Sequence, residues 1–217
     1  IHDKIQACVW IGGPGYSGIL ALGRVLNGDV TPSGKTVDTY QRDFTKDPTY
    51  QNFADNLVNN GNTYLISDGT KPSVTEHYVD YEEGIYLGYR YYETRGKGDE
   101  NWYKDNVVYP FGYGLSYTSF EWELKDASFK SGEELSWDGE NDKDFSVTVS
   151  VKNTGTVYSG KDVVEVYLSA PYKDGGIEKP AVQLVGFAKT PLLAPGQEED
   201  VEVKFSGYDF ASYDYND

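Results

Sequence analysis

Cysteine and histidine are almost absent from this 217-residue sequence, which has one cysteine, two histidines and no methionine. A single cysteine, Cys8, excludes an internal disulfide framework and a metal site built from several cysteines. His2 and His77 are far apart, and no residue near them has the spacing of a metal ligand. The sequence therefore predicts no metal ion and no other cofactor. Cys8 lies in an apolar run and is predicted to be buried in a core.

Long apolar runs are also lacking, since none approaches the roughly 18 residues of a membrane helix. Basic residues are in the minority: 19 Lys and Arg against 35 Asp and Glu give a formal net charge of −16. A surface with this much negative charge repels nucleic-acid phosphates and anionic lipids. Neither nucleic acid nor a membrane is therefore an expected partner. A neutral sugar meets no such barrier. No signal peptide is recognisable, and both a cytoplasmic and a secreted bacterial location stay open.

Apolar and aromatic residues are plentiful enough for a packed core. Hydrophobic residues make up 38% of the chain and aromatic residues 15%, including 20 tyrosines. Because a tyrosine ring is apolar and its hydroxyl still hydrogen-bonds, such enrichment is typical of strand surfaces and of carbohydrate- or protein-facing surfaces. For any single tyrosine, ordinary β-sheet packing is an equally good explanation.

The first half of the chain has the texture of an α/β domain. Residues 5–11 are apolar and predict a buried strand, and the apolar spacing from Ser17 to about Asn27 predicts a helix with a wide buried face, capped by Ser17. Residues 29–78 are polar with weak periodicity and predict a long surface excursion. Residues 79–93 predict a helical or mixed segment packed on a sheet, and residues 94–106 predict a polar loop.

The second half has the alternating pattern of an antiparallel β-sandwich. A strand is predicted from Thr118, and period-two alternation predicts further strands at 144–153, 162–169 and 200–205. The boundary falls near 115–125, which gives an α/β domain at 1–118 and a β-sandwich at 119–217. Roughly five strands are present, whereas such sandwiches use about seven.

Both halves are therefore expected to be incomplete. A lone strand–helix unit and a sandwich without its last strands leave backbone edges unpaired and cores half open, which costs free energy. The chain also begins without methionine. The sequence predicts that further polypeptide, attached or separate, completes both layers.

One glycine motif points to a different function. Residues 13–18 (GPGYSG) match the dinucleotide-binding pattern G-x-G-x-x-G, and Asp38 lies about 20 residues further on, where a ribose-binding acid is expected. Pro14 removes an amide donor from the loop that would hold phosphate, and no further strand–helix repeats follow. The glycines are better explained by close packing of a helix on a sheet.

Few residues stand out as candidates for catalysis or binding. Glu82 and Glu83 are adjacent, so they do not face each other across a bond, and a solvated acidic face explains them better than an acid/base pair. Arg90 is able to clamp a sugar hydroxyl or to tie two elements together by a salt bridge. Trp102 is able to stack on a sugar ring or to anchor its loop to the core.

Three blocks of this sequence resemble glycoside hydrolase family 3. The run VWIGGPGYSGILALGRVLNGDVTPSGKTVDTY is similar to the late part of that family's α/β sandwich domain. The runs VDYEEGIYLGYRYYET and VVYPFGYGLSYTSFEW resemble the two segments that lead into its fibronectin type III-like domain, and SVTVSVKNTGTVYSGKDVVEVYLSAP and LVGFAKTPLLAPGQ match the opening strands of that domain. Thr31 replaces a usual asparagine, and Val37-Asp38 replaces Leu-Pro.

The resemblance implies the C-terminal part of an open α/β sandwich domain followed by an incomplete fibronectin type III-like β-sandwich. It also implies part of a retaining β-glycosidase that hydrolyses terminal β-linked glucose or xylose, and the rest of that enzyme, barrel domain included, as the partner. The family's nucleophilic Asp belongs to the barrel domain and its acid/base Glu lies upstream of the first block. No catalytic residue is therefore expected in this chain.

Substrate binding is expected at the rim of the pocket. The loop at residues 12–16 follows the predicted strand, and ligands of open parallel sheets bind beyond the carboxyl ends of the strands. We therefore expect Tyr16, with Arg90 and Trp102, near a small β-glucoside. The alternatives are a non-catalytic carbohydrate-binding module and a purely structural β-sandwich module.

Overall fold

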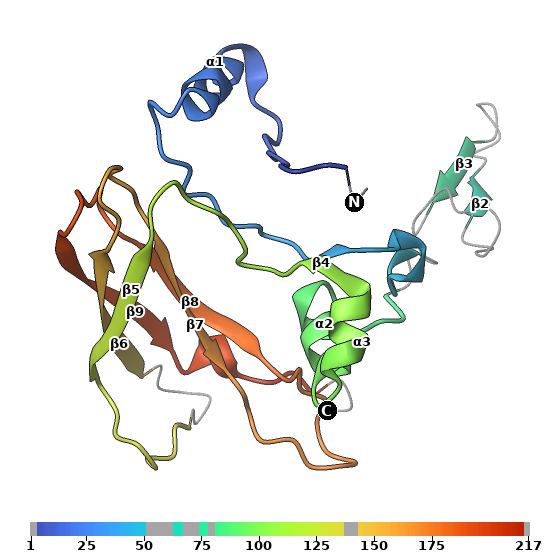
Figure 1. Ribbon diagram of the computed structural model, residues 1–217. Helices are drawn as coiled ribbons and strands as arrows, with labels where there is room; N and C mark the ends of the chain where they lie inside the picture. The colour runs from blue at the N-terminus through green and yellow to red at the C-terminus, as the bar shows by residue number, and fades with distance from the viewer. Residues whose placement is uncertain (1–3, 51–62, 67–73, 78–80, 137–142, 215–217) are drawn as a thin grey trace.

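A computed structural model describes residues 4–50, 63–66, 74–77, 81–136 and 143–214 of the chain. The β-sandwich of the second half lies beside a small helical part, and the N-terminal helix stands away from both (Figure 1). The expected combination of an α/β part and an all-β part is present.

Five antiparallel strands form the sandwich within the described residues. β5 (Phe120–Ala127), β6 (Asp144–Asn153) and β9 (Glu198–Ser206) form one sheet in the order β5-β6-β9. β7 (Val163–Leu168) and β8 (Gln183–Lys189) form the second sheet. The three strands predicted from alternation are confirmed to within two residues at each end, and the strand predicted from Thr118 begins at Phe120.

The core lies between the two sheets because every second residue of the strands is apolar. One buried cluster consists of Val149, Val151, Val164, Leu193, Val201 and Val203. A second cluster stacks Phe145 on Phe205, with ring centroids 5.6 Å apart, beside Val185. Strand periodicity of two thus places one face of β6 and of β9 in the interior.

The end of one short helix and the whole of another lie in the region 94–106, which was predicted to be a polar loop, so that prediction is wrong. α2 spans Tyr89–Gly96 and α3 spans Glu100–Asn106. The carboxylate of Asp99 accepts a hydrogen bond from the backbone N–H of Trp102 at 3.0 Å and caps α3. An N-terminal cap of this kind stabilises a helix that is too polar to show an apolar period. Within the described part of 79–93, the expected mixed segment is a turn region followed by α2.

Short strands connect the helical part to the rest of the chain. β1 (Tyr40–Gln41) pairs with β4 (Val107–Tyr109), and the 3₁₀ helix η1 (Phe44–Lys46) follows β1. β2 (Thr63–Ile66) and β3 (Val74–His77) form a hairpin. Near the C-terminus, the 3₁₀ helix η3 spans Tyr208–Phe210.

The N-terminal segment differs from its prediction. Residues 5–11 are not a strand, and Cys8 is exposed rather than buried. A strand needs a neighbour that pairs with its N–H and C=O groups, and no described segment supplies one here. The predicted helix is present as α1 (Gly15–Leu26), with Pro14 rather than Ser17 at its N-cap.

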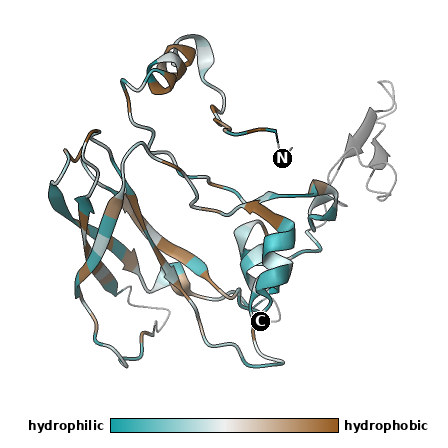
Figure 2. Cartoon of the chain, in the orientation of Figure 1, coloured by the Kyte–Doolittle hydropathy of each residue, from teal (hydrophilic) through white to brown (hydrophobic). Residues whose placement is uncertain are grey.

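The apolar face predicted for α1 is also present, but it is not buried. Leu20 is 73% exposed and Leu26 is 64% exposed. Apolar residues colour much of this helix in Figure 2, where no other element covers it. The predicted amphipathic helix is therefore correct, and the surface that should bury it is not among the described residues.

Candidate functional site

The helical part contacts the sandwich through α2. The hydroxyl of Tyr89 accepts a hydrogen bond from the backbone N–H of Leu184 in β8 at 2.9 Å. The Tyr89 ring packs against Phe111 and, edge-on, against Tyr167 of β7. One aromatic residue of α2 thus joins the helical part to both strands of the second sheet.

A loop after α1 makes a second junction with the sandwich. The ammonium group of Lys35 lies 3.0 Å from Oδ1 of Asp162, just before β7, and Nε1 of Trp122 donates to Oδ2 of the same carboxylate at 3.0 Å. The ammonium group of Lys189 donates to the carbonyl of Ser33 at 2.9 Å. The polar groups at this junction are paired, as partly buried charges must be.

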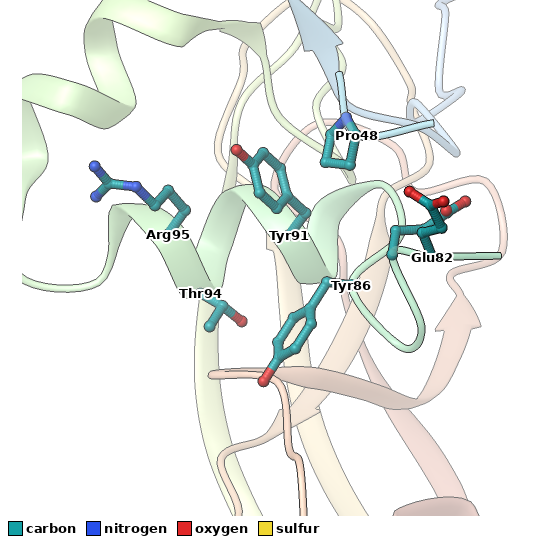
Figure 3. Close-up of a pocket in the computed structure, with 7 residues that line it drawn as sticks. Pro48, Glu82, Tyr86, Tyr91, Thr94 and Arg95 are labelled. Carbon is teal, nitrogen blue, oxygen red and sulfur yellow. The ribbon is translucent and has the colours of Figure 1, made fainter. Parts of the chain in front are cut away.

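A pocket of about 590 Å³ lies beside α2 (Figure 3). Its volume falls in the range that holds a small ligand, roughly 300–1,000 Å³. Figure 3 shows the side chains of Tyr91, Thr94 and Arg95, which come from α2. Residues of the turn before this helix and of the segment after η1 form the rest of the lining. The lining residues are Pro48, Glu82, Glu83, Tyr86, Tyr91, Thr94 and Arg95.

One wall of this pocket is held by contacts with the β7–β8 connection. The hydroxyl of Tyr86 donates a short hydrogen bond to Oε2 of Glu178. Burial, and then this bond to a carboxylate, raises the pKa of Tyr86 to about 12. The hydroxyl oxygen of Thr94 accepts from the backbone N–H of Ala181 at 2.8 Å. The pocket thus offers aromatic surface, two adjacent carboxylates and one guanidinium, a set suited to the hydroxyls of a polar ligand.

The sequence pointed to Glu82 and Glu83 but not to the other lining residues. Tyr91 and Arg95 are four residues apart, and that spacing places them on one helix face only if the segment is helical. Because residues 94–106 were predicted as a loop, this signal was missed. Asp99 and the acidic first turn indicate α3 alone, and α2 has no side-chain cap that would have revealed it.

Trp102 is packed within the chain. The guanidinium of Arg95 lies over its ring at 4.8 Å from the centroid, and the ring of Tyr92 stacks on it at 6.3 Å. Tyr91 meets its edge. These contacts hold α3 on α2, which is the anchoring role that the sequence left open for this residue.

Arg90 lies on α2 next to Tyr89. Its guanidinium carbon is 6.0 Å from the centroid of the Tyr89 ring. Its Nε is buried and has no hydrogen-bond partner among the described residues. Arg90 and Trp102 are therefore brought into the same helical part, although neither lines the pocket beside α2.

Tyr16 lies apart from this region, in the first turn of α1. Its side chain is fully exposed. Trp10, in the segment before the helix, is also exposed, at 70%. The structure therefore does not bring Tyr16 together with Arg90 and Trp102 in one site.

Neither a metal centre nor a membrane segment stands out in the part of the chain that the structure describes. No group of three or more His, Cys, Asp or Glu side chains there is placed to hold a metal ion. No helix there is both long and apolar enough to cross a bilayer.

Two family models match the chain. Residues 1–89 match the glycosyl hydrolase family 3 C-terminal domain, and residues 162–217 match the fibronectin type III-like domain. The chain belongs to glycoside hydrolase family 3. The family expected from the three sequence blocks is confirmed.

Similar proteins match nearly the whole chain. β-Glucosidase A of Butyrivibrio fibrisolvens is 37% identical over 98% of this chain and 23% of its own length. Thermostable β-glucosidase B of Acetivibrio thermocellus is 32% identical over 97% of this chain and 23% of its own length. The chain thus spans roughly a fifth to a quarter of the length of these relatives.

Solved structures of the family share the fold. A β-glucosidase from Paenibacillus barengoltzii matches with a TM-score of 0.64 and 37% identity over 87% of this chain and 16% of that one. β-Glucosidase 3B of Thermotoga neapolitana, in complex with glucose, matches with a TM-score of 0.64 and 36% identity, over 88% of this chain and 22% of that one.

Proposed function

We propose that this chain is part of a retaining β-glucosidase that removes terminal β-linked glucose, or xylose, from oligosaccharides. The observation that carries the proposal is the length of the match, since proteins named β-glucosidases are 32–37% identical over 97–98% of the chain. The order of domain-specific blocks in the sequence supports the same assignment. The nucleophilic Asp and the acid/base Glu belong to polypeptide outside these 217 residues, which includes the barrel domain.

In this proposal the chain is a scaffold for a site that other polypeptide completes. A retaining glycosidase needs two carboxyl groups about 5–5.5 Å apart on either side of the glycosidic bond. The two carboxylates of the pocket, Glu82 and Glu83, are neighbours in sequence and both line the pocket beside α2. We assign them no catalytic role. The domain division at 1–118 and 119–217 is part of the proposal, and the start of β5 at Phe120 agrees with it.

The three predicted substrate-binding residues are proposed at the rim of the pocket that the barrel domain completes. Tyr16 supports this best, because its exposed ring is open to a sugar or to a neighbouring domain. Arg90 is proposed there because a guanidinium is suited to clamp a sugar hydroxyl or a carboxylate; its Nε is buried in the described structure and has no partner there. For Trp102, the packing against Arg95 and Tyr92 supports a positioning role.

The experiment compares the 217-residue chain with the full-length enzyme from the same gene, using an aryl β-glucoside. We expect hydrolysis by the full-length enzyme and none by the chain alone. Activity of the chain alone would contradict the placement of both carboxylates elsewhere. A full-length enzyme that is well folded but inactive on β-glucosides and β-xylosides would overturn the proposed function.

Substitutions in the full-length enzyme separate binding from positioning. Tyr16→Ala is expected to raise KM while the melting temperature stays unchanged, because the ring makes no core contact. Trp102→Ala, in contrast, is expected to lower the melting temperature, because it removes the packing of α3 on α2. Tyr213→Ala, at another exposed tyrosine, is the matched control for the first substitution.

A further inference from the structure

The pocket beside α2 has two aromatic side chains in its wall. Tyr86 and Tyr91 line it, and both residues are half-buried. The ring of Tyr91 is fixed by edge-on contacts with Tyr92 and Trp102, at centroid distances of 5.1 and 6.2 Å. Tyr86 is fixed through its hydroxyl, which donates to Glu178. Both rings are therefore held in place before a ligand binds, which lowers the entropic cost of binding.

Charged groups of both signs lie at the more exposed positions of the lining. Glu82 and Arg95 are exposed, whereas the two tyrosines are half-buried. Figure 3 shows the rings of Tyr86 and Tyr91 between the carboxylate of Glu82 and the guanidinium of Arg95. Tyr91 and Arg95 are four residues apart in α2, so the helix presents them on one face. The pocket thus has aromatic surface flanked by an acceptor and a donor.

These charges select the class of ligand. The carboxylates of Glu82 and Glu83 repel an anion, and the guanidinium of Arg95 repels a cation. All three groups bind hydroxyls well, because a carboxylate accepts and a guanidinium donates hydrogen bonds. A neutral molecule with several hydroxyls therefore finds partners for both functions of its hydroxyls and meets no repulsion.

The combination of flat aromatic surface and polar groups narrows this class to sugars. In β-linked glucose and xylose the ring hydroxyls are equatorial, so each face of the sugar presents C–H groups and the edge presents hydroxyls. The faces suit the rings of Tyr86 and Tyr91, and the edge suits Glu82 and Arg95. The pocket volume of about 590 Å³ lies in the range of sites for small ligands.

We infer that the pocket beside α2 binds a sugar unit of a neutral β-linked oligosaccharide. Tyr86 and Tyr91 pack against the sugar, and Glu82 and Arg95 bond its hydroxyls. Binding here involves no bond cleavage, so the inference goes beyond the proposed function. The class of ligand follows from the pocket, and only the choice of β-linked sugars rests on the proposed function.

Binding of neutral trisaccharides to the full-length enzyme tests this inference. The enzyme is first treated with a fluorinated glucosyl fluoride, which traps the covalent glycosyl-enzyme of a retaining glycosidase, and mass spectrometry confirms the uptake. The probes are then not hydrolysed. Titration calorimetry measures the Kd of cellotriose, laminaritriose and xylotriose. We expect at least one of the three to bind in the millimolar range or more tightly.

Pocket variants show whether this pocket holds the probe. Tyr91→Leu keeps an apolar side chain but removes the flat ring, and we expect its Kd to rise at least about fivefold. Tyr91→Phe keeps the ring and is expected to bind like the parent enzyme.

Glu82→Ala removes a carboxylate from an exposed position, so the fold is retained and the test stays valid if Tyr91→Leu does not fold. We expect its Kd to rise at least about threefold, because a charge-assisted hydrogen bond is lost. Asp105→Ala, at an exposed acid of α3 that does not line the pocket, is the matched control and is expected to leave the Kd unchanged.

Three results would overturn the inference. The first is that none of the three trisaccharides binds, and the second is that Tyr91→Leu and Glu82→Ala bind the probe as tightly as the parent enzyme. The third is tighter binding of a cationic glucosamine trimer or an anionic galacturonate trimer than of every neutral probe. Failure of the enzyme to take up the fluorinated sugar would contradict the proposed function alone, because the pocket variants are then compared in the untreated enzyme.

Discussion

The ammonium group of Lys35 lies 3.0 Å from the carboxylate of Asp162, which joins the loop after α1 to the first residue before β7. Asp162 is 7% exposed and also accepts from the indole N–H of Trp122. Its backbone N–H bonds to the hydroxyl of Thr190, and its carbonyl accepts from the backbone N–H of the same residue. A single acidic residue thus connects the α/β part, β5 and the second sheet.

Loss of the cation at this junction is expected to destabilise the fold. Lys35→Met keeps the length of the side chain and leaves the Asp162 carboxylate with one partner fewer, so we expect the free energy of unfolding to fall by about 1–3 kcal/mol. Urea unfolding of the 217-residue chain measures the change. Lys104→Met is the control, because Lys104 pairs with Glu100 on an exposed helix surface, where such pairs contribute about 0–1 kcal/mol. Equal losses in the two variants would contradict the structural role of Lys35.

Asn153 is expected to be more sensitive than any exposed amide of the chain. It is fully buried, its Nδ2 donates to the carbonyls of Tyr158 and Leu193, and its Oδ1 accepts from the backbone N–H of Gly155 and from the hydroxyl of Thr118. Asn153→Ala leaves these groups buried without a partner, at a cost of about 1–3 kcal/mol for each group that water does not reach.

The measurement is the urea midpoint of Asn153→Ala beside that of Asn101→Ala, an exposed position in α3. Asn153→Ala is expected to unfold at a clearly lower urea concentration, and Asn101→Ala to differ little from the parent chain. A midpoint of Asn153→Ala close to that of the parent chain would show that the four hydrogen bonds add nothing to stability.

Two glycines are expected to respond to alanine with opposite signs. At Gly186 the new Cβ would meet backbone and side-chain atoms of β9 at 2.8–3.0 Å, so the sheets must separate and stability must fall. At Gly23, within α1, a Cβ has no neighbour within 4 Å, and alanine favours a helix over glycine by about 1 kcal/mol. Thermal unfolding of both variants measures the difference. A stabilising Gly186→Ala would contradict the close packing of β8 on β9.

The sandwich strands could be predicted because their residues alternate and their partners belong to the same chain. Asp144–Asn153 was predicted to the residue as β6. β8 is harder to recognise from alternation, because Gly186 replaces an apolar side chain at a point where the two sheets touch. The helix α3 could not be predicted from periodicity, since a cap and aromatic contacts stabilise it rather than an apolar stripe.

The N-terminal segment and the pocket show a different limit of the sequence. The apolar pattern of residues 5–11 and of α1 predicts that these side chains are buried. Burial requires a neighbouring element that covers them, and no such element is among the described residues. The pocket beside α2 combines residues from three segments that lie up to 47 positions apart, from Pro48 to Arg95. Sequence spacing does not show that these three segments lie close together unless the helix and the elements that pack beside it are already known.

Alkaline pH is expected to destabilise the chain through the buried Tyr92 and the half-buried Tyr103. Burial, and then the hydrogen bond of its hydroxyl to Asp47 at 2.9 Å, raises the pKa of Tyr92 above its usual value of 10.0. The folded state therefore keeps a proton that the unfolded chain releases above about pH 10. The stability that this group contributes is complete below that pH, and it is lost as the pH rises through the higher pKa of the folded state. Burial raises the pKa of Tyr103 in the same direction.

Tyr92→Phe separates this effect from general alkaline denaturation. At neutral pH the variant is expected to lose about 1 kcal/mol with the hydrogen bond to Asp47. Between about pH 8 and about pH 11 its free energy of unfolding should fall less than that of the parent chain, because one raised pKa is gone. Urea unfolding at several pH values provides the measurement, with Tyr213→Phe, at a 79% exposed side chain, as the control. Parallel curves for the parent chain and Tyr92→Phe would show that this hydroxyl does not link folding to pH.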